Sequence, residues 1–84
     1  MESLLQIQEK IREFIVKASY AEDGKIDNDT LIFEQGVMDS MGFMSIIGFI
    51  EEEFSVTPSG GELTEENFES IDAISNFVQR KLQS

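Results

Sequence analysis

Apolar residues recur at three- and four-residue spacing along separate stretches of the chain, and this spacing limits the fold more than any other feature. The first stripe predicts a helix over residues 3–18. Its members are Leu4, Ile7, Ile11, Phe14, Ile15 and Ala18. No stretch shows the alternation of polar and apolar residues that is typical of a half-buried β-strand. We therefore expect an all-α fold.

A second stripe predicts a helix over residues 40–54. Its apolar positions are Phe43, Ile46, Ile47, Ile50 and Phe54. Asp39, just before this helix, is a good N-cap because its carboxylate can accept hydrogen bonds from the free amides of the first turn. The opposite side of the helix then holds Met41, Met44, Gly48, Glu51 and Glu52.

The C-terminal part of the chain predicts a short helix that ends near Phe68 and a longer one that begins after Ser70. Thr64 and Ser70 are suitable N-caps for these two helices. The stripe of the last helix consists of Ile71, Ile74, Phe77, Val78 and Leu82. Together these patterns predict a small four-helix bundle with three longer helices and a short one.

A long loop, residues 21–36, should connect the first two helices, and it is rich in Asp, Asn and Gly. Loops of this length are uncommon in compact domains and are often functional. Its neighbourhood contains four apolar residues that can anchor it to the core: Ile26, Leu31, Phe33 and Val37.

Part of this loop has the order of residues seen in a calcium-binding EF-hand, and we tested that register. With Gly24 at loop position 6, the ligand positions 1, 3 and 12 hold Ser19, Ala21 and Thr30. These residues include no carboxylate, and the bidentate glutamate is missing. We therefore expect no metal site, although weak binding of a divalent ion stays open.

The chain has 84 residues, of which 40% are hydrophobic, so we expect residues 1–84 to form a single domain. There is no cysteine, which excludes a disulfide and a thiol nucleophile. No apolar run approaches the roughly 20 residues that a membrane-spanning helix needs. The opening MESLLQIQEKIREF mixes charges with helical spacing and does not resemble a signal peptide. We expect a monomeric, cytoplasmic protein without membrane insertion.

The net charge of −11 excludes some classes of partner. Nucleic acid and anionic membranes would be repelled by it. Residues 26–79 contain acids but no base, and all the basic residues lie nearer the two ends of the chain. Such a one-signed field speeds the encounter with basic partners. The alternative is that the acids serve solubility alone.

The segment GVMDSMGF, residues 36–43, places Ser40 at the start of the second helix. A catalytic serine needs a base, but the chain has no histidine, and residues 26–79 have no lysine. Met38 also stands where a nucleophile elbow needs its first glycine. A capping role is already filled by Asp39. These observations argue against an enzyme. A third role is an anchor for a phosphate-linked group, because a helix N-terminus favours an anion.

The segment FEQGVMDSMG, residues 33–42, resembles the phosphopantetheine attachment site of the acyl carrier protein family. The resemblance continues through FIEEEFSV and, more weakly, through ELTEENFESIDAISNFV, so it covers nearly the whole chain. It implies that a phosphopantetheinyl transferase moves 4′-phosphopantetheine from coenzyme A to Ser40. Acyl groups of fatty acid, lipid or polyketide biosynthesis would then be carried as thioesters on the arm. Cargo can also fold back between the helices in such carriers.

The resemblance further implies that acids of the second helix meet basic patches on partner enzymes. We expect Glu51 and Glu52 to dock in this way, with Met41 and Met44 as adaptable apolar contacts beside them. Many relatives carry acids where this chain has Gly42 and Ser45, which indicates a specialised carrier with its own loading enzyme.

Two alternatives to an acyl carrier remain open. One is an aminoacyl, D-alanyl or peptidyl carrier that is loaded by an adenylating ligase, since Asp-Ser-Met-Gly is similar to the corresponding segment of D-alanyl carriers. The other belongs to a different class, an unmodified acidic helical module that binds a protein or an ion.

Overall fold

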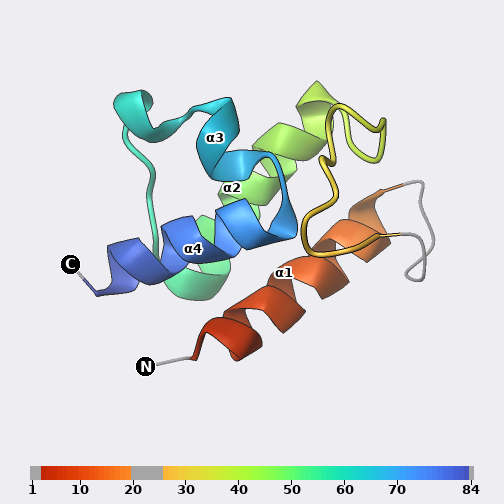
Figure 1. Ribbon diagram of the computed structural model, residues 1–84. Coiled ribbons are helices and arrows are strands. Elements are labelled where there is room, and N and C mark those ends of the chain that lie inside the picture. The colour runs from red at the N-terminus through yellow and green to blue at the C-terminus, as the bar shows by residue number, and fades with distance from the viewer. Residues whose placement is uncertain (1–2, 20–25, 84) are drawn as a thin grey trace.

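The computed structural model describes residues 3–19 and 26–83, and the regular secondary structure within these ranges is all helical, with no strand. Four α-helices follow one another: α1 (Leu4–Ala18), α2 (Ser40–Phe54), α3 (Glu65–Phe68) and α4 (Ile71–Leu82). The 3₁₀ turn η2 (Gly60–Glu62) precedes α3. The predicted all-α bundle of three longer helices and a short one is confirmed (Figure 1).

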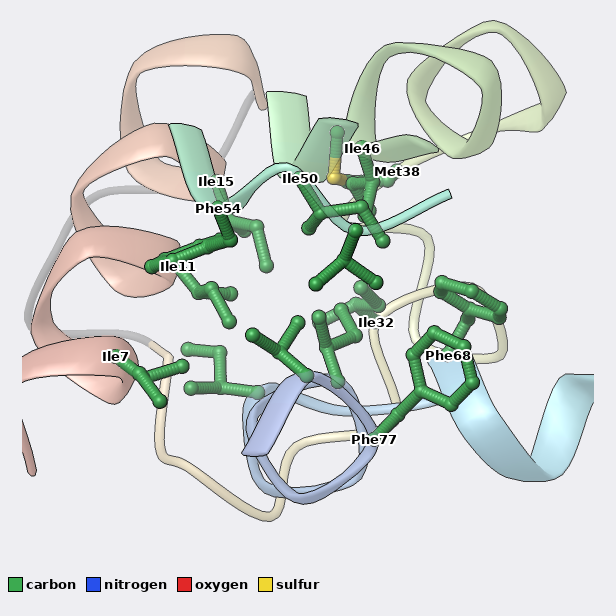
Figure 2. Packing of buried hydrophobic residues seen from close by; sticks show 14 of the residues in the cluster. Ile7, Ile11, Ile15, Ile32, Met38, Ile46, Ile50, Phe54, Phe68 and Phe77 are labelled. Carbon is green, nitrogen blue, oxygen red and sulfur yellow. The ribbon is translucent and has the colours of Figure 1, made fainter. Parts of the chain in front are cut away.

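The longer helices enclose one hydrophobic core. Helices α1 and α4 make the most extensive contact, α2 packs against both, and α3 packs against α4 (Figure 1). Figure 2 shows Ile7, Ile11 and Ile15 pointing from α1 toward the middle of the bundle, with Ile32 near the middle and Phe77 farther from α1. All five side chains are buried. The predicted stripes therefore do face the core, as helix amphipathicity requires.

Local hydrogen bonds set the helix starts. Ser3 and Gln6 form a capping box at α1, and the Ser70 hydroxyl accepts a hydrogen bond from the Ala73 amide at α4, as predicted. Thr64 precedes α3 as predicted but makes no side-chain capping hydrogen bond. Ala18 was placed on the core stripe but is exposed, because α1 has reached the edge of the bundle at its last residue.

Two residues of the α2 stripe lie at the margin of the core. Phe43 and Ile47 are half-buried, whereas Ile46, Ile50 and Phe54 are buried. A helix that packs against neighbours on one side buries the middle of its apolar stripe more than its edges.

The connection to α2 is held on several sides. The Arg12 guanidinium donates to the Ile26 carbonyl at 2.6 Å and to Asn28 Oδ1 at 2.7 Å. The Asn28 carbonyl accepts from the Asp72 amide at 2.9 Å. These bonds join the described part of the connection to both α1 and α4. Residues 20–25 of the EF-hand-like segment lie outside the described residues.

The anchors of this connection differ in part from those predicted: Phe33 is only half-buried against the core, and Ile32 takes the place expected of Leu31. Ile26 and Val37 are buried as expected, but Leu31 is half-buried while Ile32 is 0% exposed. The Ile32 amide donates to the Glu69 carbonyl and its own carbonyl accepts from the Met38 amide, both at 2.9 Å. Because both backbone groups are paired with other parts of the structure, Ile32 is fixed at the centre and Leu31 at its margin.

No helix in the described ranges is both long enough and apolar enough to cross a membrane. Across residues 3–19 and 26–83, no three His, Cys, Asp or Glu side chains gather as a metal site would require.

Candidate attachment site at the start of α2

Ser40 is the first residue of α2, and its side chain is exposed. Asp39 before it has extended backbone, and its Oδ1 accepts from the Gly42 amide at 3.0 Å. The Asp39 carbonyl accepts from the Phe43 amide at 3.0 Å. Asp39 is therefore the N-cap, as predicted, and the Ser40 hydroxyl is not needed for that role.

An open apolar cleft of about 670 Å³ lies beside Ser40. Its walls come from the connection before α2, from the first turn of α2, and from α3 with the segment that leads into it. The lining residues are Phe33, Gly36, Met38, Asp39, Ser40, Phe43, Leu63, Thr64, Glu65 and Phe68. The volume falls within the range of small-molecule pockets in proteins. A group attached to Ser40 would start at the edge of an apolar surface.

Aromatic rings form the inner side of this cleft. The Phe33 and Phe43 rings meet edge to face with centroids 5.8 Å apart. Phe43 meets Phe68 in the same way at 5.3 Å, and Phe68 lies 5.3 Å from Phe77 of α4. These are the separations at which aromatic pairs attract one another. The rings link the connection, α2, α3 and α4 in one row.

The first turn of α2 is held in place by Met38, which is buried. A Cβ added to Gly42 would lie 2.6 Å from Met38 Cε and 3.0 Å from Met38 Cβ. Gly42 therefore allows the connection to approach the helix closely. From the sequence, Gly42 was noted only as a position where relatives carry an acid, and Met38 was not placed in the core. A glycine in the first turn, where better helix formers fit, was the signal that could have indicated this contact.

The four residues predicted to meet partner enzymes all lie on the exposed side of α2. Met41 is 75% exposed and Met44 is 63% exposed, unusually high values for large apolar side chains. Glu51 and Glu52 are exposed further along the helix. Glu53 differs, because its carboxylate pairs with Lys10 of α1 at 3.1 Å.

The outer wall of the cleft is tied to α4 by a polar network that the sequence reasoning missed. Lys81 Nζ lies 3.1 Å from Glu62 Oε2, and the Ser59 amide donates to Glu62 Oε1 at 2.9 Å. The Ser59 hydrogen bond and then the Lys81 contact lower the pKa of Glu62. Arg80 donates to Asn67 Oδ1 at 3.1 Å beside them.

The fold and this site define a small helical module that offers an exposed hydroxyl beside an apolar cleft. The family model for the phosphopantetheine attachment site matches residues 9–78. The chain therefore belongs to the family of phosphopantetheine-binding carrier domains, which bind 4′-phosphopantetheine covalently and are carriers rather than catalysts. No curated protein matches the chain in sequence. Members of this family interact with phosphopantetheinyl transferases and with biosynthetic enzymes.

Proposed function

We propose that the chain is an acyl carrier protein and that Ser40 is the residue that bears its phosphopantetheine arm. The observation that carries the proposal is the position of Ser40: it opens α2, it is exposed, and it lines the apolar cleft. Its neighbour Asp39 already caps the helix. The Ser40 hydroxyl is thus left available for modification.

The helix start also suits the charge of the linkage. In the transfer, the Ser40 Oγ–P bond forms, a P–O bond of the coenzyme A pyrophosphate breaks, and adenosine 3′,5′-bisphosphate leaves. The hydroxyl proton passes to the transferase. The resulting phosphodiester is an anion beside the first amides of a 15-residue helix, where the helix dipole favours negative charge. The arm supplies a terminal thiol, on which cargo forms a thioester.

We further propose that partner enzymes dock on Met41, Met44, Glu51 and Glu52. The exposed thioether side chains can adapt to different apolar surfaces. The two carboxylates, which belong to a stretch of sequence without Lys or Arg (residues 26–79), complement a basic patch and guide the encounter. A phosphopantetheinyl transferase and a cargo-loading ligase are the partners that this surface suits.

The lack of acids in the first turns of α2 supports the proposal that the chain is a specialised carrier. Gly42 bears no charge, and the Ser45 hydroxyl donates back to the Met41 carbonyl at 3.1 Å. A transferase or ligase that reads acids at these positions finds none. We therefore propose a dedicated loading enzyme, with an acyl cargo as the first choice and an aminoacyl, D-alanyl or peptidyl cargo as the second. A monomeric protein in the cytoplasm is part of the same proposal.

Intact-mass measurement tests the attachment residue. Folded protein is incubated with coenzyme A and a promiscuous phosphopantetheinyl transferase, beside Ser40→Ala and Ser45→Ala. Ser45 is a matched control because it is also an exposed serine of α2. We expect one phosphopantetheine on the parent protein and on Ser45→Ala, and none on Ser40→Ala. Modification of folded Ser40→Ala would show that another residue bears the arm.

Loading assays on the modified protein then separate the cargo classes. Loading by an adenylating ligase without loading by a fatty-acyl enzyme would support the specialised carrier, and the reverse result would contradict it. If several transferases leave folded parent protein unmodified, the proposal that Ser40 bears the arm fails. A calcium-dependent change in helix content that Ser40→Ala does not alter would instead favour an ion-binding module.

A further inference from the structure

Phe43 stands between the cleft beside Ser40 and the interior of the bundle. It lies on α2 three residues after Ser40, lines the cleft and is half-buried. Phe33 and Phe68 contact it from the connection and from α3, each edge to face. A ring held by two neighbours at right angles has little room to swing aside.

The row of rings continues from Phe43 into the core through Phe68, which also lines the cleft. Phe68 is 0% exposed and contacts Phe77, which is buried on α4. Ile46 and Ile74 are buried in the same hydrophobic cluster. Protein interiors are closely packed and do not admit extra methylene groups unless side chains are displaced. An alkyl chain that entered from the cleft would have to separate these aromatic pairs.

We propose that Phe43 closes the interior of the bundle to cargo, so that this carrier takes short or polar acyl groups that stay in the cleft. This inference rests on the proposed attachment at Ser40. A long alkyl chain would then be covered only by the open cleft, and the part that extends beyond the cleft would stay in contact with water, which disfavours it as cargo. A short or polar acyl group gains little free energy from burial, so little is lost when it remains outside the core. Such a group can be presented to an enzyme without first being drawn out of the core. Phe43 is therefore a specificity-determining residue for cargo.

The experiment compares acetyl and octanoyl cargo on the same protein. A promiscuous transferase loads each acyl-phosphopantetheine from its acyl-coenzyme A, and intact mass confirms the loading against Ser40→Ala. The rate of thioester cleavage by hydroxylamine is then measured relative to that of the matching free acyl-coenzyme A. Methyl NMR spectra of Ile46 and Ile74 report directly whether a chain has entered the core.

We expect acetyl and octanoyl thioesters on the parent protein to be cleaved with the same relative rates, and the isoleucine methyl shifts to be the same for both. In Phe43→Ala the octanoyl thioester should be cleaved about tenfold more slowly, the factor that burial of two methylene groups supplies. Its isoleucine methyl shifts should also change. Phe43→Val provides a milder opening if Phe43→Ala is not folded at the assay temperature.

Phe49→Ala is the matched control. Phe49 is also a half-buried phenylalanine of α2, but it stacks on Phe14 of α1 with ring centroids 4.4 Å apart and does not line the cleft. Its removal destabilises the bundle without opening the barrier. We therefore expect octanoyl cargo on Phe49→Ala to behave as on the parent protein.

The outcomes separate this inference from the proposed function. No loading of the parent protein contradicts the attachment at Ser40. If the parent protein is loaded and protects its octanoyl cargo, the carrier function stands, but the proposal that the interior is closed to cargo is wrong. If octanoyl cargo stays unprotected in the folded Phe43 variants, Phe43 is not the barrier. The same conclusion follows if Phe49→Ala protects octanoyl cargo as well as the Phe43 variants do.

Discussion

Met38 packs against Gly42, four residues further along the chain, so closely that a Cβ on Gly42 would lie 2.6 Å from Met38 Cε. Met38 is buried, whereas Ser40 between them is exposed. The contact therefore fixes the turn that presents Ser40 by burying the residue two positions before it. The position of the attachment site thus depends on core packing as well as on the N-cap.

This contact predicts opposite effects of alanine at the two glycines of α2. Gly48→Ala meets no atom within 4 Å, so it should raise the free energy of unfolding by about 0.5–1 kcal/mol through helix propensity. Gly42→Ala should lower it by about 1 kcal/mol, because the Met38 terminal methyl can swing away but Met38 Cβ, 3.0 Å from the added Cβ, can move only with the backbone. Urea denaturation of both variants measures the difference. Equal stabilisation by both substitutions would show that Met38 yields at no cost.

Two substitutions of Asp39 separate the effect of its capping hydrogen bond on stability from the effect of its charge. Asp39→Ala should lower the free energy of unfolding by about 1 kcal/mol, because the Gly42 amide loses its acceptor. Asp39→Asn keeps a good cap and should stay near the parent value. Thermal denaturation measures both. A loss in Asp39→Asn as large as that in Asp39→Ala would mean that the charge, and not the cap, is what stabilises the helix start.

Arg12 should stabilise the connection before α2 as well as the whole fold. Arg12→Ala removes two hydrogen bonds from a charged group to Ile26 and Asn28, and we expect a loss of about 1.5–3 kcal/mol. Amide hydrogen exchange should rise most in the connection. Lys17→Ala is the control, because its exposed pair with Glu13 contributes at most about 1 kcal/mol. Equal losses in the two variants would contradict the role assigned to Arg12.

The lowered pKa of Glu62 predicts a pH dependence. A carboxyl whose pKa is lower in the folded state stabilises the fold above its unfolded value, here near 4.5, and this stabilisation disappears as the pH falls through the folded value. Glu62→Gln should therefore be less stable than the parent protein at pH 7, and the gap should narrow below pH 4.5. Denaturation at several pH values tests this. Since Lys81 supplies part of the effect, the gap should be smaller in a Lys81→Met background. A gap that is constant with pH would contradict the assignment.

Met44 should affect the recognition of the carrier and leave its folding unchanged. Met44→Ser should lower the kcat/KM of transfer by a phosphopantetheinyl transferase, mainly through KM, and change stability by at most about 0.5 kcal/mol because the side chain is exposed. Leu5→Ser is the matched control, since Leu5 is 64% exposed on α1, away from the proposed docking surface. Equal kinetic effects of the two substitutions would argue against docking on α2.

The acids of the same surface should act through charge. Glu51→Gln and Glu52→Gln together should slow transfer most at low ionic strength, and the effect should shrink as salt screens the exposed charges. Steady-state kinetics over a range of salt concentrations measure this. An effect that does not vary with salt would point to direct contacts instead of electrostatic steering.

Local patterns in the sequence were enough to predict the helices. The spacing of apolar residues predicted α1, α2 and α4 closely, because each amphipathic stripe needs only its own segment to be recognised. The caps Asp39 and Ser70 were predictable for the same reason, since a cap bonds to an amide three residues away. Ser40 was singled out from its immediate neighbours alone.

Tertiary structure decided what surrounds Ser40. Ile32 and not Leu31 is buried, because a hydrogen bond to Glu69 fixes the backbone there. The stripe of α2 placed Phe43 in the core, but contacts with Phe33 and Phe68 make it a wall of the cleft. These facts depend on residues from different elements that meet only after folding. The sequence therefore determined which serine opens α2, and the packing of the bundle decided the size and the aromatic lining of the space beside it.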